Sequence, residues 1–204
     1  MNTRKSSHEK IRKLTMYAIL AAITIVLQIF CTFIKIGPFP ITLALTPIII
    51  GAAIYGPKCG AFLGFVFSAT VFIMGIGPDG GTLVPMLQYN LIATVILCFL
   101  KGTAAGGIAG LVYKPIAKKS PLAATFAASA LTPIVNTGIF ALGMMSIFFG
   151  YLSDAASANG ASSPMGFLYL TVIGLNFIVE FIVNVALGTV ITRIIDYYNR
   201  KIAK

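Results

Sequence analysis

Long runs of apolar residues, separated by short polar turns, constrain this chain more than any other feature. The run from Leu14 to about Ile34 holds no charged side chain and is long enough to cross a bilayer as a helix. Similar runs recur, so that 58% of the 204 residues are hydrophobic and only 10% are charged. A soluble domain has about 25% charged residues, because its surface faces water. The outside of this chain must therefore face lipid.

The runs predict one all-α domain, a polytopic membrane bundle of six transmembrane helices. Glycine and proline clusters end most of the runs. No small-residue cleavage site follows the first run, so we expect no cleavable signal peptide. The expected parts are a basic tail at 1–13 and spans at about 14–34, 41–55, 58–76, 101–117, 122–150 and 166–195.

Residues 77–100 allow two interpretations, because they are apolar but contain Pro85 and several polar side chains. In the first, one long tilted helix covers about 86–116. In the second, the segment is an outer loop or a re-entrant segment, and the fourth span begins near Lys101. The second is slightly favoured, although irregular backbone at membrane depth must be covered by protein or line a cavity.

The basic residues indicate the orientation of the bundle. With six spans, 13 of the 15 Lys and Arg residues fall in the two tails and in the loops near 56–58 and 114–121. By the positive-inside rule, both termini are cytoplasmic. The formal charge of +10 is then a topology signal, which also attracts lipid headgroups and needs no nucleic acid to explain it. The loops expected to face outward are 35–40, 77–100 and 151–165.

Groups that catalyse reactions or hold cofactors are scarce. The chain has one histidine and five acidic residues, and no two acids are spaced as a metal-binding pair inside a span. It contains neither a Gly-rich ATP-binding loop nor a Gly-x-Ser-x-Gly elbow. Cys31, Cys59 and Cys98 are scattered through apolar runs and are interpreted as packing residues. We therefore expect no enzyme activity, no cofactor and no metal.

Glu180 is the most informative ionisable residue, because a carboxylate near the middle of a span is usually functional. Asn176 and Asn184 come four residues before and after it, so all three project from one helix face over about 12 Å. This polar face fits either a clamp between helices or the wall of a cavity that binds a small solute. The cavity is the favoured interpretation.

Other polar residues near the spans are candidates for the same site. Asn136 and Thr137 lie near the middle of the fifth run, although Asn136 could instead repair hydrogen bonding that Pro133 disrupts. Lys101 could pair with Glu180, meet a ligand carboxylate or extend to the outer interface. From the outer segment, a ligand could also be reached by Gln88 and Asn90.

Small residues offer a surface for another helix in the first run, where Ala18 and Ala22 are four residues apart. The stretches 40–44 and 51–64, with a Gly-Pro-Lys-x-Gly turn, resemble the second and third helices of S components. These are the substrate-binding subunits of energy-coupling factor (ECF) vitamin transporters. The resemblance extends to the two alanines and to residues 109–114.

The resemblance implies a substrate-binding subunit of an ABC-type importer in a prokaryotic plasma membrane. Such a subunit captures a vitamin outside and docks through Ala18 and Ala22 onto a membrane coupling protein that carries two ATPase subunits. The group holding riboflavin, pantothenate and pyridoxine-type carriers is the most similar. The absence of tryptophan argues against thiamin, and one lysine among several amides favours a pantothenate-like acid.

Two other classes of function remain. A membrane enzyme that modifies a lipid or a small solute would need clustered acids or histidines, and only Glu180 lies in a span. A ligand-free membrane scaffold would have no use for the polar face around Glu180.

The orientation can be tested with a reporter that fluoresces only in the cytoplasm. We expect fluorescence when it is fused to either terminus, because 13 of the 15 basic residues then lie on the cytoplasmic side. A dark reporter at one end would exclude an even number of spans.

Overall fold

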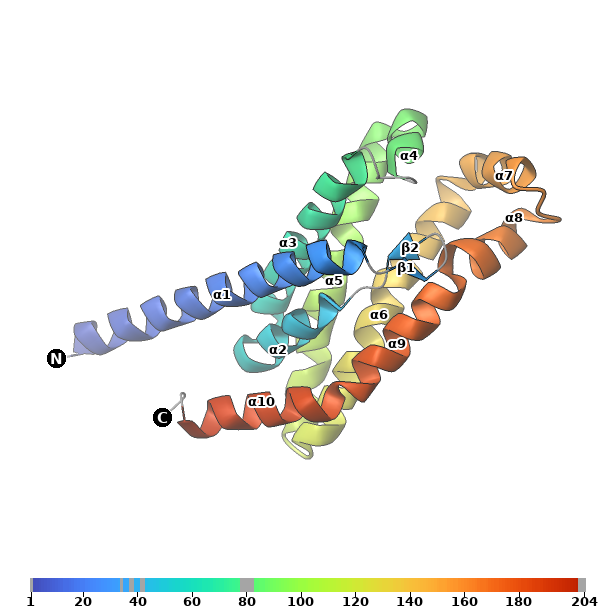
Figure 1. Cartoon of the computed structure of the whole chain (residues 1–204). Coiled ribbons are helices and arrows are strands. Elements are labelled where there is room, and N and C mark those ends of the chain that lie inside the picture. Colours follow the sequence, from blue (N-terminus) through green and yellow to red (C-terminus); the bar gives the residue numbers. More distant parts are fainter. Residues whose placement is uncertain (1, 34, 37–38, 41–42, 78–82, 202–204) are drawn as a thin grey trace.

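Helices make up almost all of the computed structural model, which describes residues 2–33, 35–36, 39–40, 43–77 and 83–201 (Figure 1). A small antiparallel hairpin, β1 (Lys35–Ile36) and β2 (Phe39–Pro40), lies between the first two helices, with Lys35 opposite Pro40. The helical elements are α1 (Asn2–Thr32), α2 (Leu45–Tyr55), α3 (Pro57–Ile76), α4 (Leu83–Tyr89), α5 (Leu91–Ala117), α6 (Pro121–Ser146), α7 (Phe149–Ala158), α8 (Pro164–Gly166), the π-helical segment η1 (Phe167–Gly174), α9 (Leu175–Ala186) and α10 (Gly188–Lys201).

Five helical stretches within the described residues are long and apolar enough to cross a membrane, and α2 is a shorter apolar helix beside them. Their outer faces carry large apolar side chains that only lipid can cover, such as Leu170 and Ile73, which are 81% and 71% exposed. The chain is therefore an all-α, multi-pass membrane protein. The five stretches are Glu9–Cys31, Pro57–Ile76, Leu91–Ala117, Pro121–Ser146 and Pro164–Ala186.

The fourth span differs from the favoured expectation. It begins at Leu91 and not near Lys101, and residues 83–89 form the separate short helix α4. The Asn90 side chain caps α5 by accepting a hydrogen bond of 3.0 Å from the backbone N–H of Ala93. Lys101 therefore lies ten residues inside α5 and does not mark a helix start.

Other boundaries also move. The expected outer loop 151–165 contains the amphipathic helix α7, and the expected run 122–150 is interrupted after Ser146. The expected span 166–195 is divided, because α10 leaves the line of α9 near Leu187 (Figure 1). The basic tail is helical from Asn2 and continues directly into the first span. The glycine-rich stretch at 78–82 lies outside the described residues.

Glycines allow α3 and α5 to pack backbone against backbone. A Cβ built on Gly60 would overlap the carbonyl oxygen of Gly106, and one on Gly64 would overlap the carbonyl oxygen of Gly102. The reciprocal additions, on Gly102 and Gly106, meet α3 in the same way. Close approach of this kind is the usual means of holding helices together in lipid, where apolar burial gives no driving force.

Apolar clusters attach the remaining helices to this pair. On one side, Leu20 of α1 and Leu45 of α2 are buried in a cluster with Phe67 of α3. On the other side, Ile49 of α2 and Ile191 of α10 belong to a cluster that α5 and α6 complete. The short helix α2 thus contributes to both clusters.

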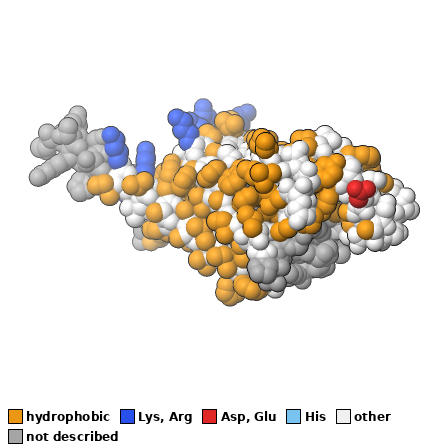
Figure 2. Space-filling model, turned by 90° about the horizontal axis from the view of Figure 1, so that it is seen from above, with side chains coloured by type: hydrophobic (Ala, Val, Ile, Leu, Met, Phe, Trp, Pro, Cys, Tyr) orange, Lys and Arg blue, Asp and Glu red, His pale blue; other side chains and the backbone are white. Residues whose placement is uncertain are grey.

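Charged side chains gather at opposite ends of the molecule (Figure 2). Lys114, Lys118 and Lys119 are exposed where α5 turns into α6, and Asp154 is exposed on α7. Both chain ends lie on the side away from α7 (Figure 1). This distribution is what a cytoplasmic location of the basic end requires, and that location stays a prediction.

The contact between α3 and α5 predicts opposite effects for two glycine substitutions. Gly64→Ala should destabilise the fold by about 1–3 kcal/mol, because the added methyl group meets backbone that cannot move aside. Gly107→Ala should be neutral or stabilising, because its methyl group would lie 3.7 Å from Ala61 and alanine favours the helix. A thermal melt with a thiol-reactive dye reports unfolding, because all three cysteines are buried. Equal melting temperatures would contradict this packing.

Candidate ligand-binding site

The polar face expected on the last span is buried in the bundle. Glu180 and Asn184 of α9 are 4% and 0% exposed, and Asn176 is half-buried. The Asn184 amide nitrogen donates to the backbone carbonyl of Glu180 at 2.8 Å, which fixes this side chain. Three acceptor atoms remain without a hydrogen-bond partner among the described residues: Asn176 Oδ1, Glu180 Oε1 and Asn184 Oδ1.

A second polar stripe runs along α6, formed by Thr125, Ser129, Thr132 and Asn136. Their spacing of three and four residues places them on one face of the helix. The two threonines donate to backbone carbonyls one turn earlier, at 3.0 and 2.6 Å, so their hydroxyl donors are used within the helix. Ser129 Oγ and Asn136 Oδ1 are buried and have no such partner in the described part of the chain.

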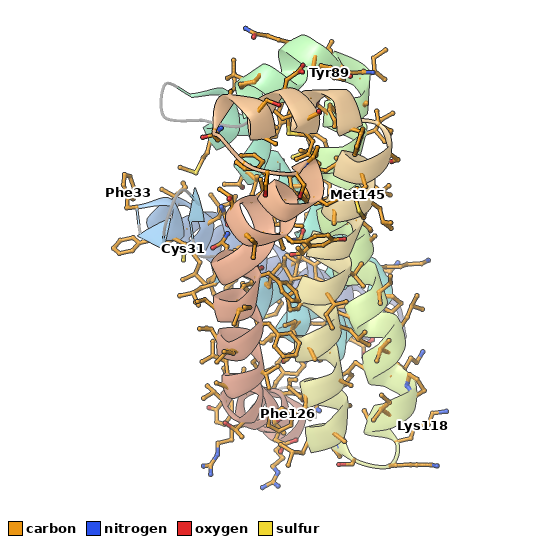
Figure 3. The ribbon with its side chains drawn as sticks, turned by 90° about the vertical axis from the view of Figure 1, so that its right-hand side faces the viewer. Cys31, Phe33, Tyr89, Lys118, Phe126 and Met145 are labelled. Carbon is orange, nitrogen blue, oxygen red and sulfur yellow. The ribbon has the colours of Figure 1, made fainter. Side chains whose placement is uncertain are left out.

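Two contacts set the register between α6 and the last span. Near the outer end, the Tyr169 hydroxyl donates to the Met145 sulfur at 3.4 Å. Near the other end, a Cβ on Gly188 would lie 3.1 Å from the Phe126 ring. In each segment the two contact residues are 19 positions apart in sequence, so the segments run antiparallel in nearly constant register. Asn136 is therefore about level with position 178, between Asn176 and Glu180. Met145 and Phe126 mark the two levels in Figure 3.

Lys101 brings a positive charge from α5 to the same region. Its Nζ lies 5.1 Å from the centroid of the Phe140 ring, within the range of a cation–π contact. Phe140 is one turn from Asn136 on α6, and Lys101 also acts electrostatically on the Glu180 carboxylate. Glu180 Oε1 accepts no hydrogen bond among the described residues, so this oxygen is available to a ligand.

Two residues of the candidate site lie in the half of the bundle nearer α4 and α7, the end that is expected to face outward. Lys101 is ten residues from the outer end of α5, and Asn136 is ten residues from the outer end of α6. Both are therefore about 15 Å below the outer ends of their helices. At that end, the Tyr89 ring of α4 packs against Phe148 and Tyr151, with ring centroids 6.0 and 6.1 Å apart. The helices α4 and α7 thus form an aromatic cover at the outer end (Figure 3).

The structure gathers some of the expected site residues and leaves others apart. Glu180, Asn176, Asn184, Asn136 and Lys101 come from three helices to one buried region. Thr137 is half-buried and lies beside this region on α6.

Two of the expected residues lie at the outer end and are exposed, Gln88 on α4 and Asn90 at the start of α5. Asn90 is about 16 Å along α5 from Lys101, and its side chain caps the helix. The two expected docking residues, Ala18 and Ala22, are exposed on α1.

Several polar atoms near this region were not expected. Besides Ser129, the buried oxygens of Ser68 on α3 and Thr46 on α2 have no hydrogen-bond partner in the described residues. Ser68 faces Gly102, the neighbour of Lys101. The spacing of the α6 stripe could have revealed Ser129 from the sequence, whereas no sequence signal connects Phe140 with Lys101.

The arrangement suits a small polar ligand better than a structural clamp. A clamp would pair these groups with one another, since an unpartnered buried polar group costs about 1–3 kcal/mol. Here carbonyl and carboxylate oxygens face inward as acceptors beside one cation. A ligand that offers hydrogen-bond donors and an anionic group would satisfy both. The fold and the candidate site are those expected of a membrane protein that binds a solute.

Comparison with known proteins identifies the family. The model of the family "ECF transporter, substrate-specific component" matches residues 12–192, which is most of the chain. The chain therefore belongs to the substrate-specific components of ECF transporters, multi-pass proteins of the plasma membrane that serve vitamin uptake.

One similar relative is the pantothenic acid transporter PanT of Lactococcus lactis subsp. cremoris (strain MG1363). It is 42% identical over 67 residues, a match that covers 31% of this chain and 34% of the relative. The matching part thus spans about a third of the length of that relative.

Replacing Glu180 by glutamine tests whether its carboxylate contacts the ligand. With pantothenate as the probe, Glu180→Gln should weaken binding about tenfold or more, the effect of losing one charged hydrogen bond of about 1.5–3 kcal/mol. The fold should persist, because glutamine keeps the shape of the side chain. Calorimetry and a thermal melt on the same purified variant separate the two roles. A lowered melting temperature with unchanged affinity would indicate a structural clamp.

Proposed function

We propose that the chain captures pantothenate, or a closely similar hydroxylated acid, from the outer side and delivers it to an ATP-driven ECF module. The observation that carries this proposal is the buried group of unpartnered acceptor oxygens on α6 and α9 beside the Lys101 ammonium. The match to a pantothenic acid transporter supports the same substrate class.

The chemistry of pantothenate complements this group. Its hydroxyl groups and amide N–H are donors, which the oxygens of Asn136, Asn176 and Glu180 can accept. Its carboxylate is an anion, which Lys101 can bind while its ammonium group lies over the Phe140 ring. Charge-assisted hydrogen bonds of this kind are stronger than neutral ones. Riboflavin and pyridoxine carry no carboxylate and would leave Lys101 without an anionic partner.

Energy for uptake comes, in this proposal, from partner subunits. The chain has no ATP-binding loop, so a membrane coupling protein and two ATPases would supply the ATP-driven step. The chain itself binds and releases the vitamin without changing it chemically. Ala18 and Ala22 would be the docking residues, because they are small and exposed on the lipid-facing side of α1.

The substrate proposal can be tested with pantothenate and its alcohol analogue pantothenol, which lacks the carboxylate. We expect the purified chain to prefer pantothenate, and Lys101→Met to weaken pantothenate binding about tenfold or more. Pantothenol binding should hardly change, because it makes no ion pair. Lys118→Met, at an exposed position far from the site, is the matched control. An equal effect of Lys101→Met on both compounds would contradict a carboxylate contact.

Docking can be tested separately with Ala18→Trp. The bulky side chain should keep the partner backbone at a distance and so prevent co-purification with the ECF module and uptake in cells. Vitamin binding by the isolated chain should survive, because Ala18 lies on the exposed side of α1. Intact complex formation in this variant would place the docking surface elsewhere.

A further inference from the structure

The last helix, α10, has two unlike faces. Its inner face is buried against α2 and α6 and carries Ile191, Thr192, Ile195 and Tyr198. The opposite face is exposed and carries Arg193, Tyr197 and Arg200, which the spacing of four and three residues brings together. Beside this cationic face, Val190 and Ile194 form an apolar edge, and they are 50% and 43% exposed. All five of these side chains are exposed.

The position of α10 places these faces near one membrane surface. The last span ends at Ala186, and α10 begins at Gly188, close against the Phe126 ring at the inner end of α6. From there α10 turns away from the direction of α9 (Figure 1). It therefore begins just beyond the last apolar span, at the end of the bundle where exposed basic residues lie.

The exposed charged residues at this end of the bundle are mainly basic. Lys114, Lys118 and Lys119 are exposed at the neighbouring turn between α5 and α6. The acidic residue of α10, Asp196, is half-buried and acts on Tyr113 of α5, which places its charge toward the bundle and not on the cationic face.

We propose that the exposed side of α10, namely Arg193, Tyr197, Arg200 and the apolar edge of Val190 and Ile194, binds the headgroups of anionic phospholipids. Two arginines beside an aromatic ring match a phosphate-rich surface, and the aliphatic edge matches the upper part of the acyl chains. A protein partner would be expected to bury the apolar edge away from lipid. This lipid contact is separate from the candidate vitamin site, whose residues lie on α5, α6 and α9.

A single tryptophan provides a direct probe, because the chain contains none. Ile194→Trp places the probe on the apolar edge of α10. The full chain is reconstituted in vesicles whose phosphatidylglycerol or phosphatidylcholine is brominated near the top of the acyl chains, and quenching by each lipid gives their relative binding. We expect a preference for phosphatidylglycerol of about fivefold for each arginine that contacts it. Added salt should reduce the preference, because salt screens exposed charges.

Matched variants in the Ile194→Trp background identify the source of the preference. Arg193→Gln with Arg200→Gln should bring the ratio near one, whereas Arg193→Lys with Arg200→Lys should retain most of it. Lys118→Gln with Lys119→Gln, at the neighbouring turn, should leave it intact. Equal quenching by both lipids in the parent, or a preference that survives the glutamine pair, would overturn the proposal. Absence of quenching by either lipid would overturn it too, because the edge would then contact protein.

Discussion

Every part of this structure depends on one constraint, the absence of water around most of its surface. In lipid, a polar group must find a partner within the protein or lie at the membrane surface. The chain accordingly exposes apolar side chains along its length, keeps its exposed lysines and arginines at one end, and turns Glu180, Asn184 and Asn136 inward. The buried polar groups of α6 and α9 lie at similar levels of the bundle, and they make up most of the candidate site.

The same constraint explains why the two halves of the bundle are built differently. Between α3 and α5, glycines bring backbone against backbone and leave no room for a ligand. Between α6 and α9, contacting residues are larger, and polar side chains fill the level between Met145 and Phe126. The tightly packed helices α3 and α5 can provide a rigid wall of the site, while the less tightly packed helices α6 and α9 can adapt to a ligand. Lys101 belongs to the tight pair and faces the polar one.

The helical bundle and the polar face of α9 could be predicted from the sequence, because both follow from local patterns of residues. A charge-poor run that is long enough to cross lipid has few alternatives to a membrane-spanning helix. Glu180, with an asparagine one turn away on either side, predicts a polar helix face. The start of α5 was not predicted, because Pro85 and the polar side chains within residues 77–100 favoured an outer loop or a re-entrant segment over a continuous helix. The contact of Lys101 with the Phe140 ring joins two helices, and no local pattern reveals it.

Neighbouring charges that do not satisfy each other explain how such a site can be both stable and selective. A direct bond between Lys101 and Glu180 would neutralise both groups and leave little for a ligand to gain. Instead the ammonium rests on an aromatic face, which stabilises the cation without using its hydrogen-bond donors. The carboxylate keeps a buried oxygen unpartnered. A ligand with an anionic end and a donor end would complete both, whereas one that lacks either end would leave a polar group of the site without a partner. Discrimination of this kind rests on the penalty for the wrong ligand more than on the gain from the right one.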